Sequence, residues 1–288
     1  MKALIILVLA SMVFGAGGYF TYEMFIHPKV ALEEEKHLPP LPPPPDPSLP
    51  DFERAVAVRE NGTLLEAREA LSAFVEHNPQ STKIDEARDL LGEVNTAIFL
   101  SPVAAPEKEA YIVQRNDVIG RVAMRMHTSA ELLMRANNLP SAMLHIGQKL
   151  TVSQGEFSLV ISRKTDKVVL LNKGRFFKQY TVRSWPPIHA KKAIAGRKAP
   201  PPMPKQAGKV TEKLAWFNGA RVLFSDKGYV NATHWIQINI PGCTLYGDPG
   251  TSADAANAKP PGGGIALPPD APAELAAILN KGAPVTLE

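Results

Sequence analysis

The side chain in this sequence best suited to nucleophilic chemistry is Cys243, the only cysteine among 288 residues. A single thiol excludes an intramolecular disulfide and a metal site built from several thiolates. A lone cysteine is more often an inert buried side chain than a nucleophile. No spacing typical of zinc ligands is present, and we predict neither a metal nor a cofactor. Whether Cys243 has a function therefore depends on the elements that surround it.

The composition is typical of a globular protein with linkers. Hydrophobic residues make up 45% of the chain and charged residues 21%, and the length allows roughly two domains. The 27 prolines lie largely in clusters, which indicates linkers. The net charge of +4 is mild, and the chain lacks zinc-finger spacing, an RNA-binding aromatic signature and a basic helix. We therefore predict no nucleic-acid partner.

The N-terminus begins MKALIILVLASMVFGAGGYF, one lysine followed by a long uncharged apolar run. A run of this length predicts a membrane-spanning helix or a secretory signal within residues 1–25. We expect an uncleaved anchor, with cleavage after residue 17 as the alternative. Either segment predicts that the rest of the chain is exported. The proline-rich residues 26–50 predict an extended stalk.

Residues 51–102 show helical periodicity. Apolar residues recur on one face of each of two predicted helices, the first from Leu64 and the second from Ile84, with Asn78-Pro79 between them. The pair resembles a tetratricopeptide-type unit. Because a solenoid needs about three repeats, we expect a docking hairpin, with cell-wall enzymes as candidate partners.

Residues 108–153 predict a strand, two helices and a second strand. Tyr111 to Val113 and Lys149 to Val152 indicate the strands. Asp117 is positioned to cap the first helix, and Thr128 with Glu131 forms a capping-box pattern before the second.

This segment resembles a LysM domain. The resemblance is carried by the opening Tyr-x-Val, Asp117, Asn137-Asn138-Leu139 and the closing Ile146-Gly147-Gln148-Lys149-Leu150. It implies binding of N-acetylglucosamine-containing glycan, chiefly peptidoglycan, between two loops. On this chain the implied glycan-binding residues are Asn116, Asp117, Val118, Ile119, Leu144, His145 and Ile146. For Asp117 and Ile146 a purely structural role is an equal alternative. Asn116 stands where the family usually has glycine, and asparagine also tolerates a positive φ.

Residues 157–288 predict a mostly-β domain. FSLVISRKTDKVVLLNKGRFFKQYTV indicates three strands with turns at Lys164–Asp166 and Asn172–Gly174, and HWIQINIPG indicates another strand. The expected fold class is therefore α+β and multidomain: an N-terminal membrane helix, a helical hairpin, a βααβ module and this β domain.

The β domain resembles an L,D-transpeptidase catalytic domain. The meander matches its start, and Ile265-Ala-Leu-Pro through Pro284-Val285 matches the segment that follows the catalytic cysteine. The resemblance implies a cysteine nucleophile, a histidine base and an arginine in a Ser-His-Gly-Cys-Ile/Val-Arg motif. Here Gly264 stands at the cysteine position and Ala266 at the arginine position. Asn239 is matched to a second histidine of the family.

The expected function is that of a peptidoglycan-binding cell-envelope protein whose transpeptidase-like domain is inactive and serves binding or scaffolding. The alternative is a divergent L,D-transpeptidase that uses Cys243 with His234, nine residues earlier. If the protein is bacterial, as these domains imply, the expected place is the periplasmic face of the inner membrane, or outside the cell after cleavage.

Overall fold

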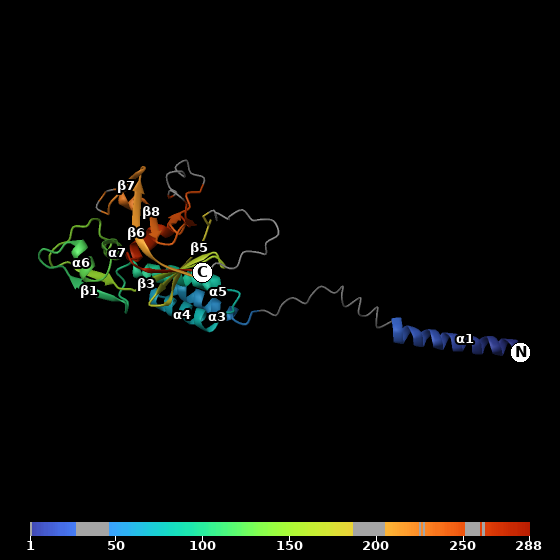
Figure 1. The fold of residues 1–288 in the computed structure, drawn as a ribbon. Coiled ribbons are helices and arrows are strands. Elements are labelled where there is room, and N and C mark those ends of the chain that lie inside the picture. Colours follow the sequence, from blue (N-terminus) through green and yellow to red (C-terminus); the bar gives the residue numbers. More distant parts are fainter. Residues whose placement is uncertain are drawn as a thin grey trace, which may run out of the picture. The chain divides into compact units, whose positions relative to one another are not determined.

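The computed structural model describes residues 2–26, 46–186, 205–224, 226, 228–250, 260 and 263–288. The chain divides into two compact units, Met1–Asp46 and Pro47–Glu288 (Figure 1). Most of the predicted stalk, residues 27–45, lies outside the described residues.

The first unit contains α1 (Lys2–Thr21) and a π-helical turn, η1 (Tyr22–Ile26). The apolar run thus forms a helix. No helix among the described residues is both long and apolar enough to cross a membrane. The predicted N-terminal membrane helix is therefore not supported. Gly15, Gly17 and Gly18, in the second half of α1, contribute no side-chain surface to it.

Three helices open the second unit: α3 (Leu49–Asn61), α4 (Leu64–His77) and α5 (Ile84–Phe99). The two periodic stretches form α4 and α5, and α3 is an additional helix that the predicted pair omitted. Thr63 and Glu66 form a capping box at the start of α4. The helices share their own apolar core, which includes Phe52, Leu71 and Leu91.

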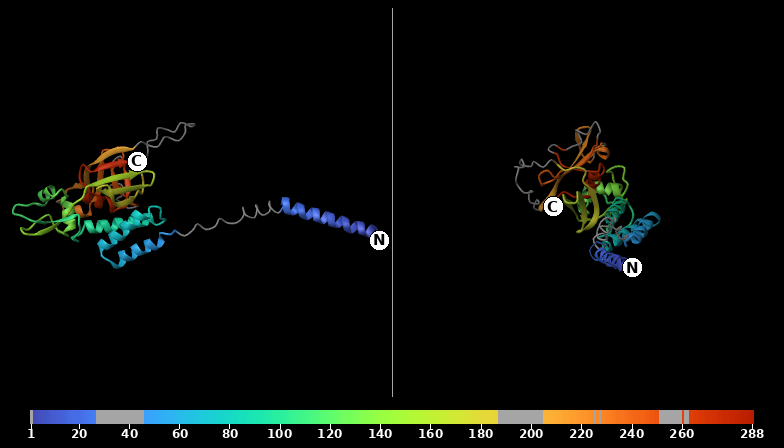
Figure 2. Two further views of the ribbon diagram at one scale, coloured as in Figure 1. Left: turned by 90° about the horizontal axis from the view of Figure 1, so that it is seen from below. Right: turned by 90° about the vertical axis from the view of Figure 1, so that its right-hand side faces the viewer.

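The face of α5 that points away from α4 is covered by the chain itself. α5 packs on strand β5 (Arg175–Thr181), and Asn95 Nδ2 donates to the Phe177 carbonyl at 2.8 Å. Gln179 Nε2 donates to Asp89 Oδ1 at 2.8 Å. Figure 2 shows the helices against the strands of the sheet. If the helices dock another protein, the surface available for it therefore lies on α3 and α4.

The small module consists of β1 (Lys108–Ile112), α6 (Ile119–Arg125), α7 (Ala130–Ala136) and β2 (Lys149–Ser153). β1 and β2 pair antiparallel, with Tyr111 opposite Leu150. The predicted caps are wrong by one residue. Val118 is the N-cap of α6 because the Asp117 carboxylate turns back toward β1, and Ser129 rather than Thr128 caps α7, accepting from Leu132 N at 2.9 Å.

The β domain is a single sheet with the strand order β10-β9-β8-β6-β11-β3-β4-β5, and β7 (Ala220–Val222) pairs beside β6. The remaining strands are β3 (Phe157–Ser162), β4 (Lys167–Asn172), β6 (Gln206–Phe217), β8 (Thr233–Ile238), β9 (Leu245–Gly247), β10 (Ile265–Leu267) and β11 (Pro284–Leu287). The predicted meander is confirmed as β3, β4 and β5. β11 joins the two halves of the sheet, parallel to β3 and antiparallel to β6.

The main core lies between this sheet and the helices around it. Helix α9 (Ala271–Ile278) contributes Leu275 and Ile278, and η2 (Tyr229–Asn231) precedes β8. Two members of the core come from other modules: Phe99 from α5 and Leu132 from α7. Phe99 meets Phe157 and Phe177 edge to face at centroid distances of 5.1 and 5.6 Å. The helices, the βααβ module and the sheet are therefore built around a shared core.

Candidate functional site

The two loops predicted to bind glycan lie side by side. Val113 N donates to the Gln148 carbonyl at 2.9 Å, and the Val113 carbonyl accepts from Gly147 N at 2.8 Å. These bonds join the loop that follows β1 to the loop that precedes β2. Asn116 has φ +69°, the left-handed conformation that the family's usual glycine would supply. The structure thus brings residues 116–119 and 144–146 to the same end of the module.

The loop residues divide into exposed and supporting positions. Val118 is 55% exposed and Ile146 73% exposed, and Asn116 and His145 are also exposed. Ile119 is buried in the core of the module, and half-buried Leu144 packs against the same core. Exposed apolar side chains on adjacent loops suit the faces of sugar rings. Ile119 and Leu144 support the fold.

Asp117 holds the first loop in place. Its carboxylate accepts from Tyr111 Oη at 2.5 Å and from Gln114 N at 2.8 Å, and it pairs with Arg125 at 3.4 Å. These hydrogen bonds, that of Tyr111 first, hold the pKa of Asp117 below its ordinary value. Because its side chain is only 4% exposed, Asp117 supports the shape of the loop through these internal bonds.

In the β domain, the position of the expected nucleophile is closed. Gly264 is buried immediately before β10, the strand that pairs with β9. A Cβ atom at Gly264 would lie 2.2 Å from the Thr244 carbonyl oxygen and 3.2 Å from Tyr246 Cδ1. The same Thr244 oxygen accepts the ladder bond from Ile265 N at 2.8 Å, so it cannot move away without breaking the sheet. In this backbone the position has no room for any side chain.

Apolar side chains form a row across four strands next to this position. Ala266 pairs with Tyr246, Tyr246 with Trp235, and Trp235 with Leu214. All four are buried in one cluster, and Trp216 packs against it with its ring centroid 5.0 Å from that of Trp235. Ala266 therefore lies within an apolar cluster, where an arginine would lack a charged partner among these side chains.

Asn239 lies elsewhere. It follows β8, and its Oδ1 accepts from Lys209 N at 2.6 Å, which ties it to β6. The side chain that the structure places beside Gly264 is Tyr246. Sequence reasoning missed Tyr246; the short run Leu245-Tyr246-Gly247 after the Pro241-Gly242 turn was the available sign of another strand.

Cys243 and His234 are not brought together. His234 lies at the start of β8, whereas Cys243 lies past its end, in a turn closed by Cys243 N donating to the Ile240 carbonyl at 3.1 Å. The strand from His234 to Ile238 alone rises roughly 13 Å. Cys243 is 2% exposed, and burial raises the pKa of its thiol, although the charge of Arg163 acts in the opposite direction. Burial and a raised pKa both disfavour the thiolate that a cysteine nucleophile requires.

His234 itself is buried, at 4% exposure, and neither ring nitrogen has a hydrogen-bond partner among the described residues. Its ring meets that of Tyr229 edge to face at 5.0 Å. Burial lowers the pKa of His234, which favours the neutral imidazole; Glu131 acts in the opposite direction.

Comparison with known proteins gives one sequence match. Residues 111–153 match the family model of the LysM domain. A search of curated proteins finds no match.

Solved structures similar to this chain are mainly L,D-transpeptidases. A mutant of the Enterococcus faecium L,D-transpeptidase is 17% identical over 46% of this chain and 50% of its own, with a TM-score of 0.29. The L,D-transpeptidase from Mycobacterium smegmatis is 14% identical over 50% and 64%, with a TM-score of 0.30. That from Stackebrandtia nassauensis is 18% identical over 48% and 57%, with a TM-score of 0.28. This chain thus spans half to under two thirds of their lengths. Residues 111–153 are a LysM domain, and structural neighbours of the chain are L,D-transpeptidases.

Proposed function

We propose that this protein binds peptidoglycan in the cell envelope through its LysM domain, and that its transpeptidase-like β domain is a non-catalytic support for that binding. The observation that carries the proposal is the pair of adjacent loops in a module that matches the LysM family. Val118 and Ile146 present apolar surface there, and exposed backbone at residues 116–119 offers hydrogen bonds to glycan.

The absence of catalysis is proposed from the residues at the expected active site. Gly264 has no side chain, its Cβ direction is filled by the Thr244 carbonyl, and Ala266 replaces the arginine. Without a thiolate the domain cannot form the acyl-enzyme on which this family's chemistry depends. The β domain then serves to hold the LysM domain, to which it is joined through Leu132 and through Ser129 Oγ donating to the Ala277 carbonyl at 2.8 Å.

A sacculus pull-down tests the binding. Because Leu132 belongs to the core of the β domain, deleting the LysM domain would disturb the rest of the unit, so point variants of the full chain are preferable. We expect Val118→Asp combined with Ile146→Asp to lower the sacculus-bound fraction at least tenfold, since a carboxylate would be desolvated against the sugar face. Met124→Asp is the matched control, because Met124 is 76% exposed on the same domain outside both loops. Unchanged binding by the double variant would refute the proposed loops.

Muropeptide analysis tests the absence of catalysis. Sacculi incubated with the full-length protein should show the same muropeptide profile as sacculi incubated with Cys243→Ala. New cross-links, or loss of terminal stem residues, that depend on Cys243 would establish the transpeptidase or carboxypeptidase alternative.

A further inference from the structure

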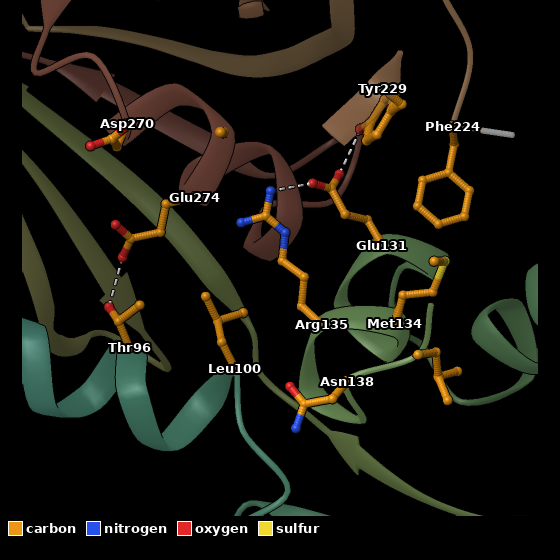
Figure 3. Close-up of a pocket in the computed structure, with 12 residues that line it drawn as sticks. Thr96, Leu100, Glu131, Met134, Arg135, Asn138, Phe224, Tyr229, Asp270 and Glu274 are labelled. Atoms are coloured by element: carbon orange, nitrogen blue, oxygen red, sulfur yellow. Dashed lines mark hydrogen bonds and ion pairs between the residues drawn. The ribbon is translucent and has the colours of Figure 1, made fainter. Parts of the chain in front are cut away.

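A cavity of about 670 Å³ lies where three parts of the second unit meet (Figure 3). Helix α5 contributes Thr96 and, just beyond its end, Leu100; α7 and the residues after it contribute Met134, Arg135 and Asn138; and the α9 segment contributes Ala273 and Glu274. Phe224 and Tyr229 close the remaining side. The volume is within the range of small-molecule sites. The cavity is separate from the 116–119 and 144–146 loops and from Gly264, none of which lines it.

The walls are fixed by internal bonds. Glu131 accepts from Tyr229 Oη at 2.7 Å with one oxygen and pairs with Arg135 at 2.9 Å through the other. Glu274 accepts from Thr96 Oγ1 at 2.7 Å and from Lys178 Nζ at 2.8 Å. Each carboxylate is thus already paired with a cation: Glu131 with Arg135 of the same helix, and Glu274 with Lys178 of β5. They shape the cavity and leave little acceptor capacity for a ligand.

Apart from the exposed Asp270 carboxylate, which also lines the cavity, the groups that remain available are hydrogen-bond donors beside apolar side chains. Arg135 has five N–H groups, of which one is used by Glu131, and its guanidinium points into the space between α7 and α9 (Figure 3). The Asn138 side chain has no hydrogen-bond partner among the described residues. Leu100, Met134, Leu139 and Phe224 supply apolar surface around these donors. Such a site suits a ligand with carbonyl and hydroxyl groups and an apolar face.

We propose that this junction cavity is a second glycan site, which binds N-acetylhexosamine units. The acetamido carbonyl accepts from Arg135 and Asn138, and the acetyl methyl and the ring face pack on the leucine, methionine and phenylalanine side chains. Leu139 follows α7 five residues before the loop that begins at Leu144, so both sites belong to one segment of the LysM domain. This inference rests on the proposed glycan binding and adds a site that exists only while the LysM domain is docked on α5 and α9.

The test is calorimetric titration of the full chain with the N-acetylglucosamine trisaccharide. Wild type should bind two equivalents. Asn138→Gly removes the amide while keeping the φ of +52° at that position, and Ala273→Phe fills the cavity. Each should weaken one of the two sites at least tenfold and leave the other unchanged. Asn218→Gly is the matched control, because Asn218 is an exposed asparagine with φ +50° in the β6–β7 turn.

The outcomes separate this inference from the proposed function. The second site would be overturned if wild type bound one equivalent of trisaccharide, if the Val118→Asp/Ile146→Asp variant lost it, and if the cavity variants kept it. The loop site would then remain supported. If the cavity variants lost trisaccharide binding and the loop variant bound it as wild type does, the loop site would be refuted and the cavity site supported. Binding of a free stem tetrapeptide in the cavity in place of the trisaccharide would also overturn the inference.

Discussion

A nucleophile in a β domain of this kind needs a side chain directed into a cleft, and at Gly264 the backbone of the neighbouring strand occupies that direction. The obstacle is the Thr244 carbonyl, which is part of the β9–β10 ladder. The proposed absence of catalysis at this position therefore rests on packing as well as on the lack of a thiol.

A cysteine introduced at position 264 should accordingly not be reactive. We expect Gly264→Cys to lower the free energy of unfolding by about 1–3 kcal/mol, because the new side chain overpacks a buried strand. Mass spectrometry after incubation with a carbapenem should detect no acyl adduct on the variant. Adduct formation on the introduced thiol without loss of stability would contradict the closed site. Ser184→Cys, on the segment that pairs with β10 at Ala266, controls for effects of a new thiol.

His234 predicts a pH dependence of stability. Its pKa is lowered by burial, with Glu131 opposing this and Arg135 and Lys213 reinforcing it. The imidazole therefore takes up a proton at a higher pH in the unfolded chain than in the folded one. The contribution of His234 to the free energy of unfolding is fully present above pH 6.5 and is lost as the pH falls toward the folded pKa. Urea unfolding between pH 7.5 and 5 should show this loss in wild type and a flatter profile in His234→Phe. His77→Phe, at an exposed site, should keep the wild-type slope.

At the scale of elements, the loop between β1 and α6 is organised by one carboxylate. Asp117 connects Tyr111 on β1, the loop backbone at Gln114 and Arg125 at the end of α6. A helix that began with Asp117 as its cap would leave these groups without their common acceptor. The loop shape that presents Val118 thus depends on a residue with little exposure of its own.

Asp117→Asn should therefore loosen the loop. The amide oxygen can replace Oδ2, which accepts from both Tyr111 and Gln114, but the amide nitrogen replaces Oδ1, which pairs with Arg125, and the negative charge is lost. We expect faster amide hydrogen exchange at residues 114–118 and weaker sacculus binding, with α9 unaffected. In wild type the contribution of Asp117, whose pKa is lowered, is present above the unfolded pKa and is lost as the pH falls through the folded value. Asp51→Asn, at an exposed α3 site, is the control; an equal effect would contradict this role.

At the scale of the whole second unit, the LysM domain and the β domain share side chains. Two neighbouring leucines of α7 point in different directions: Leu133 into the core of the LysM domain, and Leu132 into the core of the β domain. Both are nearly or fully buried. This pair allows the coupling between the two domains to be measured.

Leu132→Ala should cost about 2–5 kcal/mol of unfolding free energy and should raise hydrogen exchange in both α7 and α9. Leu133→Ala creates a cavity of the same kind but should raise exchange within the LysM domain alone. Exchange confined to the LysM domain in both variants would show that the domains open independently, and would also remove the basis of the junction cavity.

Much of this protein follows from local pattern. Alternation predicted β3, β4 and β5, helical periodicity predicted α4 and α5, and fixed spacings in residues 111–152 indicated the LysM domain, because each signal depends on residues close in sequence. The alignment with the family motif likewise placed Gly264 and Ala266 at the cysteine and arginine positions from the sequence alone. The additional helix α3 and the one-residue shifts of the caps show that the ends of elements depend on finer competition between hydrogen bonds.

Only the tertiary structure decided which residues meet. Strand register placed Tyr246 rather than Asn239 beside Gly264 and separated Cys243 from His234, and register is set by pairing between strands distant in sequence. The same holds for Glu131, which a helical pattern presents as a capping residue and which packing places against Tyr229 at the junction of the domains. Local sequence thus determined the individual elements and the glycine at position 264, whereas long-range packing decided that the domains form one unit, because the contacts that join them lie far apart along the chain.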